Sequence, residues 1–164
     1  MTPLITAYIG LGSNLHQPIR QVQAAIIELK QQRHLQDVQA SPIYASKPVG
    51  PQDQPDFINA VARVKTRLGP HDLLDLLQDL EQHHGRIRKR HWGERTLDLD
   101  LLTYGHAEIR TPRLTVPHPL LFTRSFVLYP FADLDAHFPF NNGLTLNHYL
   151  QKVAFDLIPV KKGN

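Results

Sequence analysis

Apolar residues follow two different periods in the first part of the chain. Residues 4–11 place apolar side chains at every second position, which predicts a strand with one buried face. The turn residues Gly12-Ser13-Asn14 are predicted to end this strand. From about Pro18 the apolar spacing becomes that of a helix, and proline suits a first turn. The apolar positions are Ile5, Ala7, Ile9 and Leu11 in the strand, then Ile19, Val22, Ile26 and Leu29 in the helix.

Two further strands and a loop are predicted next. Residues 36–44 are typical of a second strand that ends at Tyr44. Residues 47–55 contain three prolines and a glycine, which indicates a loop. Residues 57–65 alternate again and predict a third strand with two distinct faces. One face holds Ile58, Ala60, Ala62 and Val64, and the other holds Phe57, Asn59, Val61 and Arg63.

A second helix and a fourth strand complete the main pattern. Gly69-Pro70 opens a helix with a strongly apolar face, and Gly85 suits its end. Residues 97–102 then alternate leucine with aspartate, as a strand does. The order strand-helix-strand-strand-helix-strand predicts an α+β fold with a ferredoxin-like βαββαβ core.

Additional C-terminal elements are expected after this core. Residues 126–131 are predicted to include one or two helical turns, and residues 146–153 a short helix. No repeat, low-complexity tract or linker interrupts the chain, so residues 1–164 are expected to form a single domain.

Positive charge is concentrated in one segment. The 164 residues carry 18 Lys and Arg against 15 Asp and Glu, a formal net charge of +3. Residues 86–95 hold five of the basic side chains and only one acid, Glu94, so the remaining chain has 13 basic and 14 acidic side chains. This distribution argues against general polyanion binding and for one local anion site.

Composition excludes several classes of protein. A chain that is 41% hydrophobic and 20% charged is neither disordered nor fibrous. The absence of cysteine excludes a disulfide, a thiolate nucleophile and a cysteine-ligated zinc. The sequence shows no signal peptide and no apolar run of membrane-spanning length, so a cytoplasmic protein without membrane contact is expected.

Two carboxylates on one strand are the sharpest chemical feature. Residues two apart in a strand face the same way, so Asp98 and Asp100 project together while Leu97, Leu99 and Leu101 enter the core. Two nearby carboxylates repel each other unless a cation lies between them, and Mg²⁺ takes one or two carboxylates together with phosphate oxygens and waters. The alternative is a half-exposed strand with a solvated polar face.

The basic segment just before this strand changes that comparison. Carboxylates beside guanidinium groups provide what phosphoryl transfer needs, namely metal bridges and Arg forks for developing charge. A solvated basic loop and a weak nucleic-acid patch are the alternatives. The segment contains Trp92 but no series of aromatic residues that could stack bases, which argues against RNA binding as the main role.

The common nucleotide-binding loops are absent from the sequence. Residues 10–15 begin like a dinucleotide fingerprint but carry Leu15 where the last glycine should stand, and no P-loop spacing occurs. Gly12 and Asn14 are therefore interpreted as turn residues. His118 lies between two prolines in a predicted loop. It either donates a hydrogen bond to a phosphate or has no chemical role.

Four motifs in order resemble the 6-hydroxymethyl-7,8-dihydropterin pyrophosphokinase family of the folate pathway. The resemblance spans nearly the whole chain, and its segments are Gly12-Ser13-Asn14-Leu15, residues 50–60, residues 85–102 with His91-Trp92-Gly93-Glu94-Arg95-Thr96-Leu97-Asp98-Leu99-Asp100, and Arg113-Leu114-Thr115-Val116-Pro117-His118. The family's α+β ferredoxin-like domain agrees with the order of elements above. The resemblance implies transfer of diphosphate from ATP to the pterin's hydroxymethyl oxygen, with AMP as the second product.

The resemblance also implies roles for individual residues. Asp98 and Asp100 match the ligands of two Mg²⁺ ions, and Arg86 and Arg95 match mobile catalytic arginines. The positions that match the pterin pocket are Ser46, Val49, Phe57, Asn59, Trp92 and Phe126. Those that match ATP contacts are Gln78, Glu81, Arg88, Lys89, Trp92, Leu101, Arg113, Thr115, His118 and Arg124. The expected partners are these two small molecules, with no nucleic acid and no membrane, and the expected state is a monomer.

Three features depart from the family pattern, and two other functions are alternatives. Ser46-Lys47 stands where the family often has Thr-Pro, Pro119 replaces a common aromatic residue, and the segment at Arg90-His91 is one residue shorter than in some members. A nucleotidyltransferase would place its Gly-Ser shortly before the carboxylates, whereas here Ser13 precedes Asp98 by 85 residues. A basic RNA-binding domain would leave Asp98 and Asp100 without a role, because they would repel a phosphate backbone.

Overall fold

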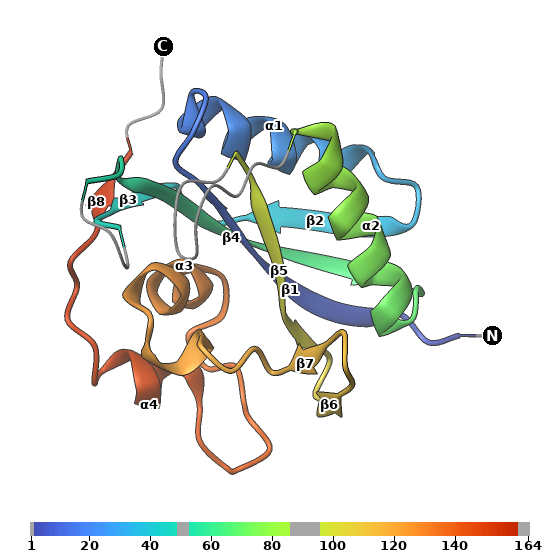
Figure 1. Cartoon of the computed structure of the whole chain (residues 1–164). Helices are drawn as coiled ribbons and strands as arrows, with labels where there is room; N and C mark the ends of the chain where they lie inside the picture. The colour runs from blue at the N-terminus through green and yellow to red at the C-terminus, as the bar shows by residue number, and fades with distance from the viewer. Residues whose placement is uncertain (1, 49–52, 86–95, 161–164) are drawn as a thin grey trace.

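The computed structural model describes residues 2–48, 53–85 and 96–160. Its centre is an antiparallel sheet in the order β5-β1-β4-β3-β8, with β2 also paired to β4 (Figure 1). The strands of this sheet are β1 (Ile5–Ser13), β2 (Leu35–Ala40), β3 (Tyr44–Ser46), β4 (Phe57–Thr66), β5 (Asp98–Tyr104) and β8 (Ile158–Pro159). A separate hairpin joins β6 (Ile109–Arg110) to β7 (Thr115–Val116).

Helices cover both faces of the sheet. α1 (Pro18–Gln31) and α2 (Pro70–His83) lie on one face, and α3 (Ser125–Asp135) and α4 (Leu146–Leu150) lie on the other, as Figure 1 shows. The short 3₁₀ turn η1 (Leu121–Thr123) precedes α3. None of the helices in the described ranges is long and apolar enough to cross a membrane.

The two faces of β4 bury two separate hydrophobic clusters, as the alternation of its residues predicts. Ile58, Ala60, Ala62 and Val64 join Ala7, Ile9 and Leu11 of β1 under α1 and α2. Val61 faces the other way, into a cluster with Leu128 and Phe131 of α3. The predicted faces of the first and third strands are therefore confirmed, because a side-chain period of two divides each strand between two cores.

The α3 side of β1 changes character along the strand. Tyr8 is buried beneath α3, where its ring stacks on Phe131 with centroids 4.2 Å apart. Two and four residues later the same face carries Gly10 and Gly12, which have no side chains to fill the space beyond α3. This half of the sheet face is therefore left open, and it forms the floor of a cavity.

Most predicted elements are confirmed, and one is wrong. The βαββαβ order holds when β2 and β3 are counted as two halves of one predicted strand. α3 and α4 fall where helical turns were expected, and Gly85 takes a left-handed conformation after α2. The predicted single strand over 36–44 is two strands, β2 and β3. Pro42 has no N–H to continue the ladder, and the Ser41 hydroxyl accepts the Val61 N–H at 2.9 Å in place of a backbone carbonyl.

A second correction concerns the end of the first strand. β1 continues to Ser13, so Gly12 is a strand residue, paired with Asn59 and Asp98, and not a turn residue. Asn14 is 1% exposed, and its Nδ2 donates to the Gln54 Oε1 at 3.0 Å and to the Pro55 carbonyl at 3.1 Å. It fastens the loop before β4 to the end of β1.

Candidate active site

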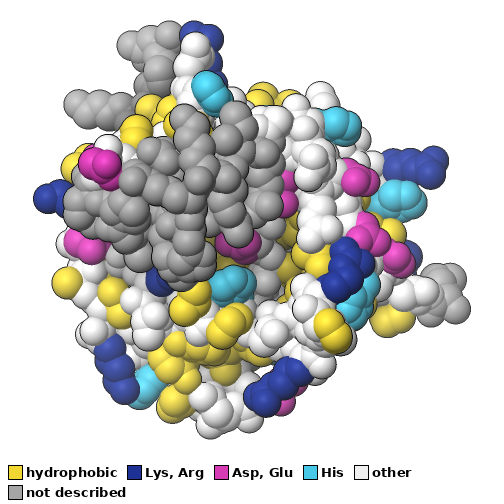
Figure 2. All heavy atoms as spheres, viewed as in Figure 1, with side chains coloured by type: hydrophobic (Ala, Val, Ile, Leu, Met, Phe, Trp, Pro, Cys, Tyr) yellow, Lys and Arg dark blue, Asp and Glu magenta, His cyan; other side chains and the backbone are white. Residues whose placement is uncertain are grey.

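A cavity of about 260 Å³ lies on the open half of the sheet, between the sheet and the start of α3. Its lining is Gly10, Leu11, Gly12, Ser46, Lys47, Phe57, Asn59, Ala60, Asp98, Asp100, Leu102, His118, Leu120, Arg124, Phe126 and Val127. In Figure 2, charged side chains of both signs are scattered over the described part of this view, and apolar side chains gather around α3 and α4. The cavity brings together residues from six separate stretches of the chain.

One end of the cavity is aromatic and carries a fixed amide. The register of β3 against β4 pairs Ser46 with Phe57, and Asn59 lies two residues further along β4. The Asn59 Nδ2 donates to the Ser46 Oγ at 2.7 Å, in a site where Asn59 is 4% exposed. A Cβ at Gly12 would lie 3.4 Å from the Asn59 Oδ1. Glycine therefore permits the close approach of β1 to this amide, whose Oδ1 lies over the cavity floor.

The other end of the cavity is acidic. Asp98 is half-buried and Asp100 is exposed, both on the cavity side of β5, while Leu99 between them is buried in the opposite core. Their cross-strand partners on β1 are Gly12 and Gly10. Because these partners have no side chains, the two carboxylates meet no side chain of their cross-strand neighbours on β1.

His118 has a defined tautomer at the rim of this end. Its ring Nδ1 accepts the Leu120 backbone N–H at 3.2 Å, which places the proton of the neutral ring on Nε2. Burial lowers the pKa of His118; the negative charge of Asp100 opposes this shift, and Arg124 adds to it. The histidine is thus favoured in its neutral form, with one N–H available to donate.

Arg124 links the two ends of the cavity. Its guanidinium carbon lies 5.4 Å from the centre of the Phe126 ring, within the range of a cation–π contact. Both residues line the cavity, one with a positive charge and one with an aromatic face. The start of α3 therefore contributes to the aromatic end and to the charged end.

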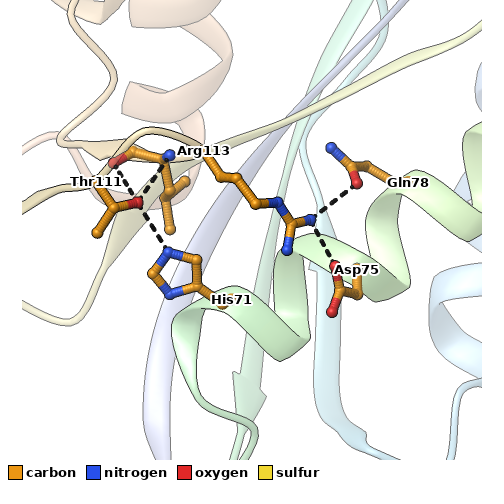
Figure 3. Close-up of polar contacts among 6 residues, drawn as sticks. His71, Asp75, Gln78, Thr111 and Arg113 are labelled. Carbon is orange, nitrogen blue, oxygen red and sulfur yellow. Dashed lines mark hydrogen bonds and ion pairs between the residues drawn. The ribbon is translucent and has the colours of Figure 1, made fainter.

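A second group of predicted residues lies around the outer edge of β5 and does not line the cavity. The Arg113 Nη2 donates to the Asp75 Oδ1 at 2.6 Å and to the Gln78 Oε1 at 3.1 Å, while His71 contacts Thr111 beside them (Figure 3). Thr115 is exposed on β7, and the Leu101 side chain is buried in the core. The structure thus separates the predicted nucleotide contacts into two neighbouring groups.

Glu81 belongs to this outer group but is turned inward. It is 6% exposed, and its Oε2 accepts the Leu99 N–H at 2.8 Å. A carboxylate of α2 therefore holds the strand residue that lies between the two aspartates.

Six predicted site residues lie outside the described ranges. They are Val49, Arg86, Arg88, Lys89, Trp92 and Arg95.

Sequence reasoning also missed part of the lining. In the sequence, Lys47 stands out only as a departure from the family pattern, Gly10 only as part of an incomplete nucleotide fingerprint, and Gly12 as a turn residue and part of a family motif; all three line the cavity. A usable signal was present, because two glycines at a spacing of two within an alternating strand leave one stretch of a sheet face bare.

Carboxylates and an aromatic pocket lie at opposite ends of one cavity on an α+β domain, an arrangement that suits small-molecule ligands. Residues 8–136 match the family 7,8-dihydro-6-hydroxymethylpterin-pyrophosphokinase (HPPK). The chain is 46% identical over 151 residues to the 2-amino-4-hydroxy-6-hydroxymethyldihydropteridine pyrophosphokinase of Haemophilus influenzae, a match that covers 92% of this chain and 94% of that one. The corresponding Pseudomonas aeruginosa protein is 46% identical over 149 residues, with 91% and 92% covered. The chain belongs to the HPPK family.

Solved structures support the same fold. Wild-type Plasmodium falciparum HPPK-DHPS with pteroate superposes with a TM-score of 0.74 at 13% identity, covering 93% of this chain and 43% of that chain. A second structure of the wild-type Plasmodium falciparum protein gives a TM-score of 0.68 at 13% identity, with 92% of this chain and 41% of that chain covered. The chain spans about two fifths of these longer proteins, and at this identity the likeness shows the ferredoxin-like α+β fold alone.

Proposed function

We propose that this chain transfers the terminal diphosphate of ATP to the hydroxymethyl oxygen of 6-hydroxymethyl-7,8-dihydropterin, in folate biosynthesis. The hydroxymethyl oxygen forms a bond to the β-phosphorus, the bond from the β-phosphorus to the oxygen bridging it to the α-phosphorus breaks, and AMP leaves. The hydroxyl proton is released in the same step. The observation that carries the proposal is that one cavity holds both the aspartate pair and the aromatic end with its fixed amide.

The aromatic end suits a pterin. A pterin is flat and aromatic on its faces and polar at its edge, so the rings of Phe57 and Phe126 can cover it. Because the Asn59 Nδ2 is engaged by Ser46, its Oδ1 is the group that faces the ligand. An acceptor oxygen held in place favours a ring edge that carries an N–H and disfavours one that does not.

Asp98 and Asp100 fit Mg²⁺. They are hard oxygen donors on one strand face, and the remaining ligands of such an ion are normally phosphate oxygens and waters. Within the described ranges, no group of three or more His, Asp or Glu side chains is arranged to hold a metal without a substrate. When bound, Mg²⁺ would neutralise charge on the ATP phosphates.

His118 and Arg124 complete the charged end. Arg124 offers a guanidinium for phosphate oxygens, and the neutral ring of His118 offers the proton on its Nε2. Diphosphate transfer depends on positioning and charge stabilisation more than on a strong base. Arg86 and Arg95 are assigned to the transferred group and Trp92 to the pterin through the family resemblance.

The outer group is assigned to the rest of ATP. Val49 is assigned to the pterin, and Arg88 and Lys89 to the nucleotide, on the same basis as Arg86. The outer edge of β5 is where the hairpin β6–β7 approaches α2, through the contact of Arg113 with Asp75 and Gln78. A nucleoside bound at this edge would place its phosphates toward Asp98 and Asp100. The residues assigned to it are Gln78, Glu81, Leu101, Arg113 and Thr115.

Domain organisation, cellular location and oligomeric state complete the proposal. We propose one catalytic domain over residues 1–164, because both hydrophobic clusters share the same sheet. We also propose a cytoplasmic monomer that takes two small-molecule substrates, since one chain supplies both ends of the cavity.

The test is the nucleotide product. Incubation with ATP, Mg²⁺ and the pterin should yield AMP, and formation of ADP, or no reaction, would contradict the proposal. Asp98→Ala and Asp100→Ala should each abolish AMP formation while the melting temperature stays close to that of the wild type. Asp79→Ala, which removes an exposed acid on α2, is the matched control and should keep full activity.

A further inference from the structure

The C-terminal stretch of residues 153–160 runs along the outside of the aromatic end. In Figure 1 it passes from α4 beside α3 and reaches the edge of the sheet as β8, next to β3. α3 carries Phe126, and β3 carries Ser46. This stretch thus contacts the two elements that form opposite walls of the aromatic end, and its own residues are absent from the cavity lining.

Its contact with α3 falls at the first residue of the helix. The Ser125 hydroxyl donates to the Asp156 Oδ1 at 2.5 Å, and Ser125 directly precedes Phe126. α3 has no acidic residue in its first turn and no side-chain cap of its own. A carboxylate near a helix N-terminus is favoured by the exposed N–H groups and by the helix dipole. Asp156 therefore supplies, from a distant part of the chain, the negative charge that the first turn of α3 lacks.

A second contact with α3 lies one turn further along. The Tyr129 hydroxyl donates to the Val153 carbonyl at 2.7 Å. The ring of Phe155 meets the Tyr129 ring edge-on at 4.9 Å and the Tyr44 ring at 6.2 Å. Phe155 is 53% exposed, so its position is set by these two ring contacts and not by burial in a core.

The contact with β3 is a backbone ladder. β8 pairs with β3 through Ala45 opposite Ile158, and the Val160 N–H donates to the Ile43 carbonyl at 2.8 Å. The two walls are also joined directly, because the Tyr44 hydroxyl donates to the Asp133 Oδ2 at 2.5 Å. β3, α3 and residues 153–160 therefore form a closed triangle of contacts behind the aromatic end.

We infer that residues 153–160 set the affinity of the site for the pterin, and that Asp156 is a positioning residue that acts through Ser125 on Phe126. The inference rests on the proposed function, since it names the substrate bound at the aromatic end. The carboxylate holds the start of α3, and with it Phe126, against β3, and so fixes the gap between Phe126 and Phe57, the residue that pairs with Ser46 of β3. A looser helix start would widen that gap and weaken the contact with both faces of the ring.

The effect should be larger for the pterin than for ATP. Asp98 and Asp100 lie on β5, at the opposite edge of the sheet from β8, with three strands between them, and the outer group lies beyond β5. Of the described residues assigned to ATP, Arg124 is the one that lies next to Ser125. Loss of the Ser125–Asp156 hydrogen bond should therefore weaken pterin binding more than ATP binding.

The experiment measures two dissociation constants for each variant by calorimetry. One is for α,β-methylene-ATP with Mg²⁺. In this analogue a CH₂ group replaces the oxygen between the α- and β-phosphorus atoms, so the bond that breaks in the reaction is absent. The other is for 6-hydroxymethylpterin with that analogue and Mg²⁺ saturating. The variants are Asp156→Ala, Ser125→Ala, the double variant and Asp156→Asn, with Lys152→Ala as the control on the neighbouring exposed position. Melting temperatures report on the fold.

Asp156→Ala and Ser125→Ala should each raise the pterin dissociation constant about three- to tenfold, the range expected for one hydrogen bond. The double variant should be no worse than the worse single one, because both remove the same bond. Asp156→Asn keeps an acceptor and should recover most of the affinity. The analogue constant should stay within about twofold throughout, and Lys152→Ala should match the wild type.

Two results would overturn the inference while leaving the proposed function intact. One is unchanged pterin affinity in Asp156→Ala. The other is an equal loss of affinity for pterin and analogue, which would indicate general destabilisation. If the wild-type protein binds no pterin and forms no AMP, the proposed function itself fails, and the two failures are therefore distinguishable.

Discussion

The Glu81 carboxylate accepts the backbone N–H of Leu99 at 2.8 Å, and Leu99 is the residue between Asp98 and Asp100. β5 is an edge strand of the sheet, paired on one side with β1, so its other side needs partners for its backbone groups. Glu81 supplies one of them from α2, with only 6% of the residue exposed. The second helix of the βαββαβ core thus supports the strand that carries Asp98 and Asp100.

Removal of this support should affect both activity and the strand. Glu81→Ala leaves the Leu99 N–H without its acceptor, which costs about 1–3 kcal/mol of unfolding free energy. It should also lower kcat about tenfold or more, because the two carboxylates lose their fixed position. Glu81→Gln keeps an acceptor oxygen, so its kcat and its unfolding free energy should lie between those of the wild type and those of Glu81→Ala.

Amide hydrogen exchange separates this role from a general loss of stability. The Leu99 amide should exchange faster in Glu81→Ala, while amides in the middle of β4 keep their protection relative to the global unfolding free energy. Uniform loss of protection across the sheet would contradict the assignment. Asp79→Ala, on the exposed side of the same helix, should leave kcat and exchange unchanged.

Ser46 is predicted to control which atom of the Asn59 amide faces the pterin. Ser46→Ala removes the closer acceptor of the Asn59 Nδ2 and leaves the longer contact with the Phe57 carbonyl at 3.5 Å, so the amide is held less firmly in its orientation. We expect the KM for the pterin to rise about fivefold, the KM for ATP to stay constant, and kcat to change little, as for loss of a ground-state contact. Steady-state kinetics with each substrate varied in turn gives the answer. A change in the ATP KM alone would place Ser46 at the wrong end of the cavity.

Arg113 and Asp75 form an exposed ion pair, with side chains 49% and 53% exposed. Such pairs contribute at most about 1 kcal/mol to stability. Asp75→Ala should therefore lower the melting temperature only slightly. Arg113→Ala should raise the KM for ATP about tenfold, since a charge-assisted contact is lost, whereas Asp75→Ala should change it by less than about threefold. If both variants lost ATP binding equally, the pair as a whole would be the binding element.

Tyr44 should titrate unusually late. Burial, together with the hydrogen bond to Asp133 and its negative charge, raises the pKa of Tyr44 from 10.0 to about 12. A raised pKa means that the fold favours the neutral phenol. Its contribution to stability is complete below pH 10 and is lost as the pH rises from 10 through 12.

Spectrophotometric titration of the tyrosines checks this. The difference between the wild type and Tyr44→Phe should be a single tyrosine ionising near pH 12, and the variant should lose less unfolding free energy between pH 10 and 12. If the tyrosine that is lost in Tyr44→Phe instead ionised near pH 10, the contact with Asp133 would not favour the neutral phenol.

Side-chain periodicity was sufficient to predict the core of this fold. Two faces of β4 and one face of β1 follow directly from a period of two, and Leu97, Leu99 and Leu101 are buried as the alternation around Asp98 requires. These predictions succeed because alternate residues of a strand face opposite sides of the sheet, so a shift by one residue would move every side chain to the other face.

Features that depend on distant partners were not accessible from the sequence. The break at Ser41 depends on a hydroxyl that replaces a carbonyl toward Val61. β8 is two residues long and exists because residues 158–159 meet β3. The bond from Ser125 to Asp156 joins positions 31 residues apart. No local pattern encodes such contacts, so periodicity cannot reveal them.

The candidate site was predicted unevenly for the same reason. Asp98 and Asp100 form a local pattern on one strand, whereas the orientation of Asn59 and the inward turn of Glu81 depend on tertiary contacts. The family resemblance named both residues, but only the structure shows which atom of each is engaged.

In the proposed reaction, both terminal phosphates of ATP move together to the pterin. Phosphorus NMR of one reaction containing the enzyme, ATP, Mg²⁺ and 6-hydroxymethyl-7,8-dihydropterin tests it most directly. The predicted result is the appearance of AMP and a pterin diphosphate in equal amounts, at the rate at which ATP disappears. An Asp98→Ala sample should show the signals of ATP and neither product. Accumulation of ADP with a pterin monophosphate, or of AMP with free pyrophosphate and unchanged pterin, would contradict the account.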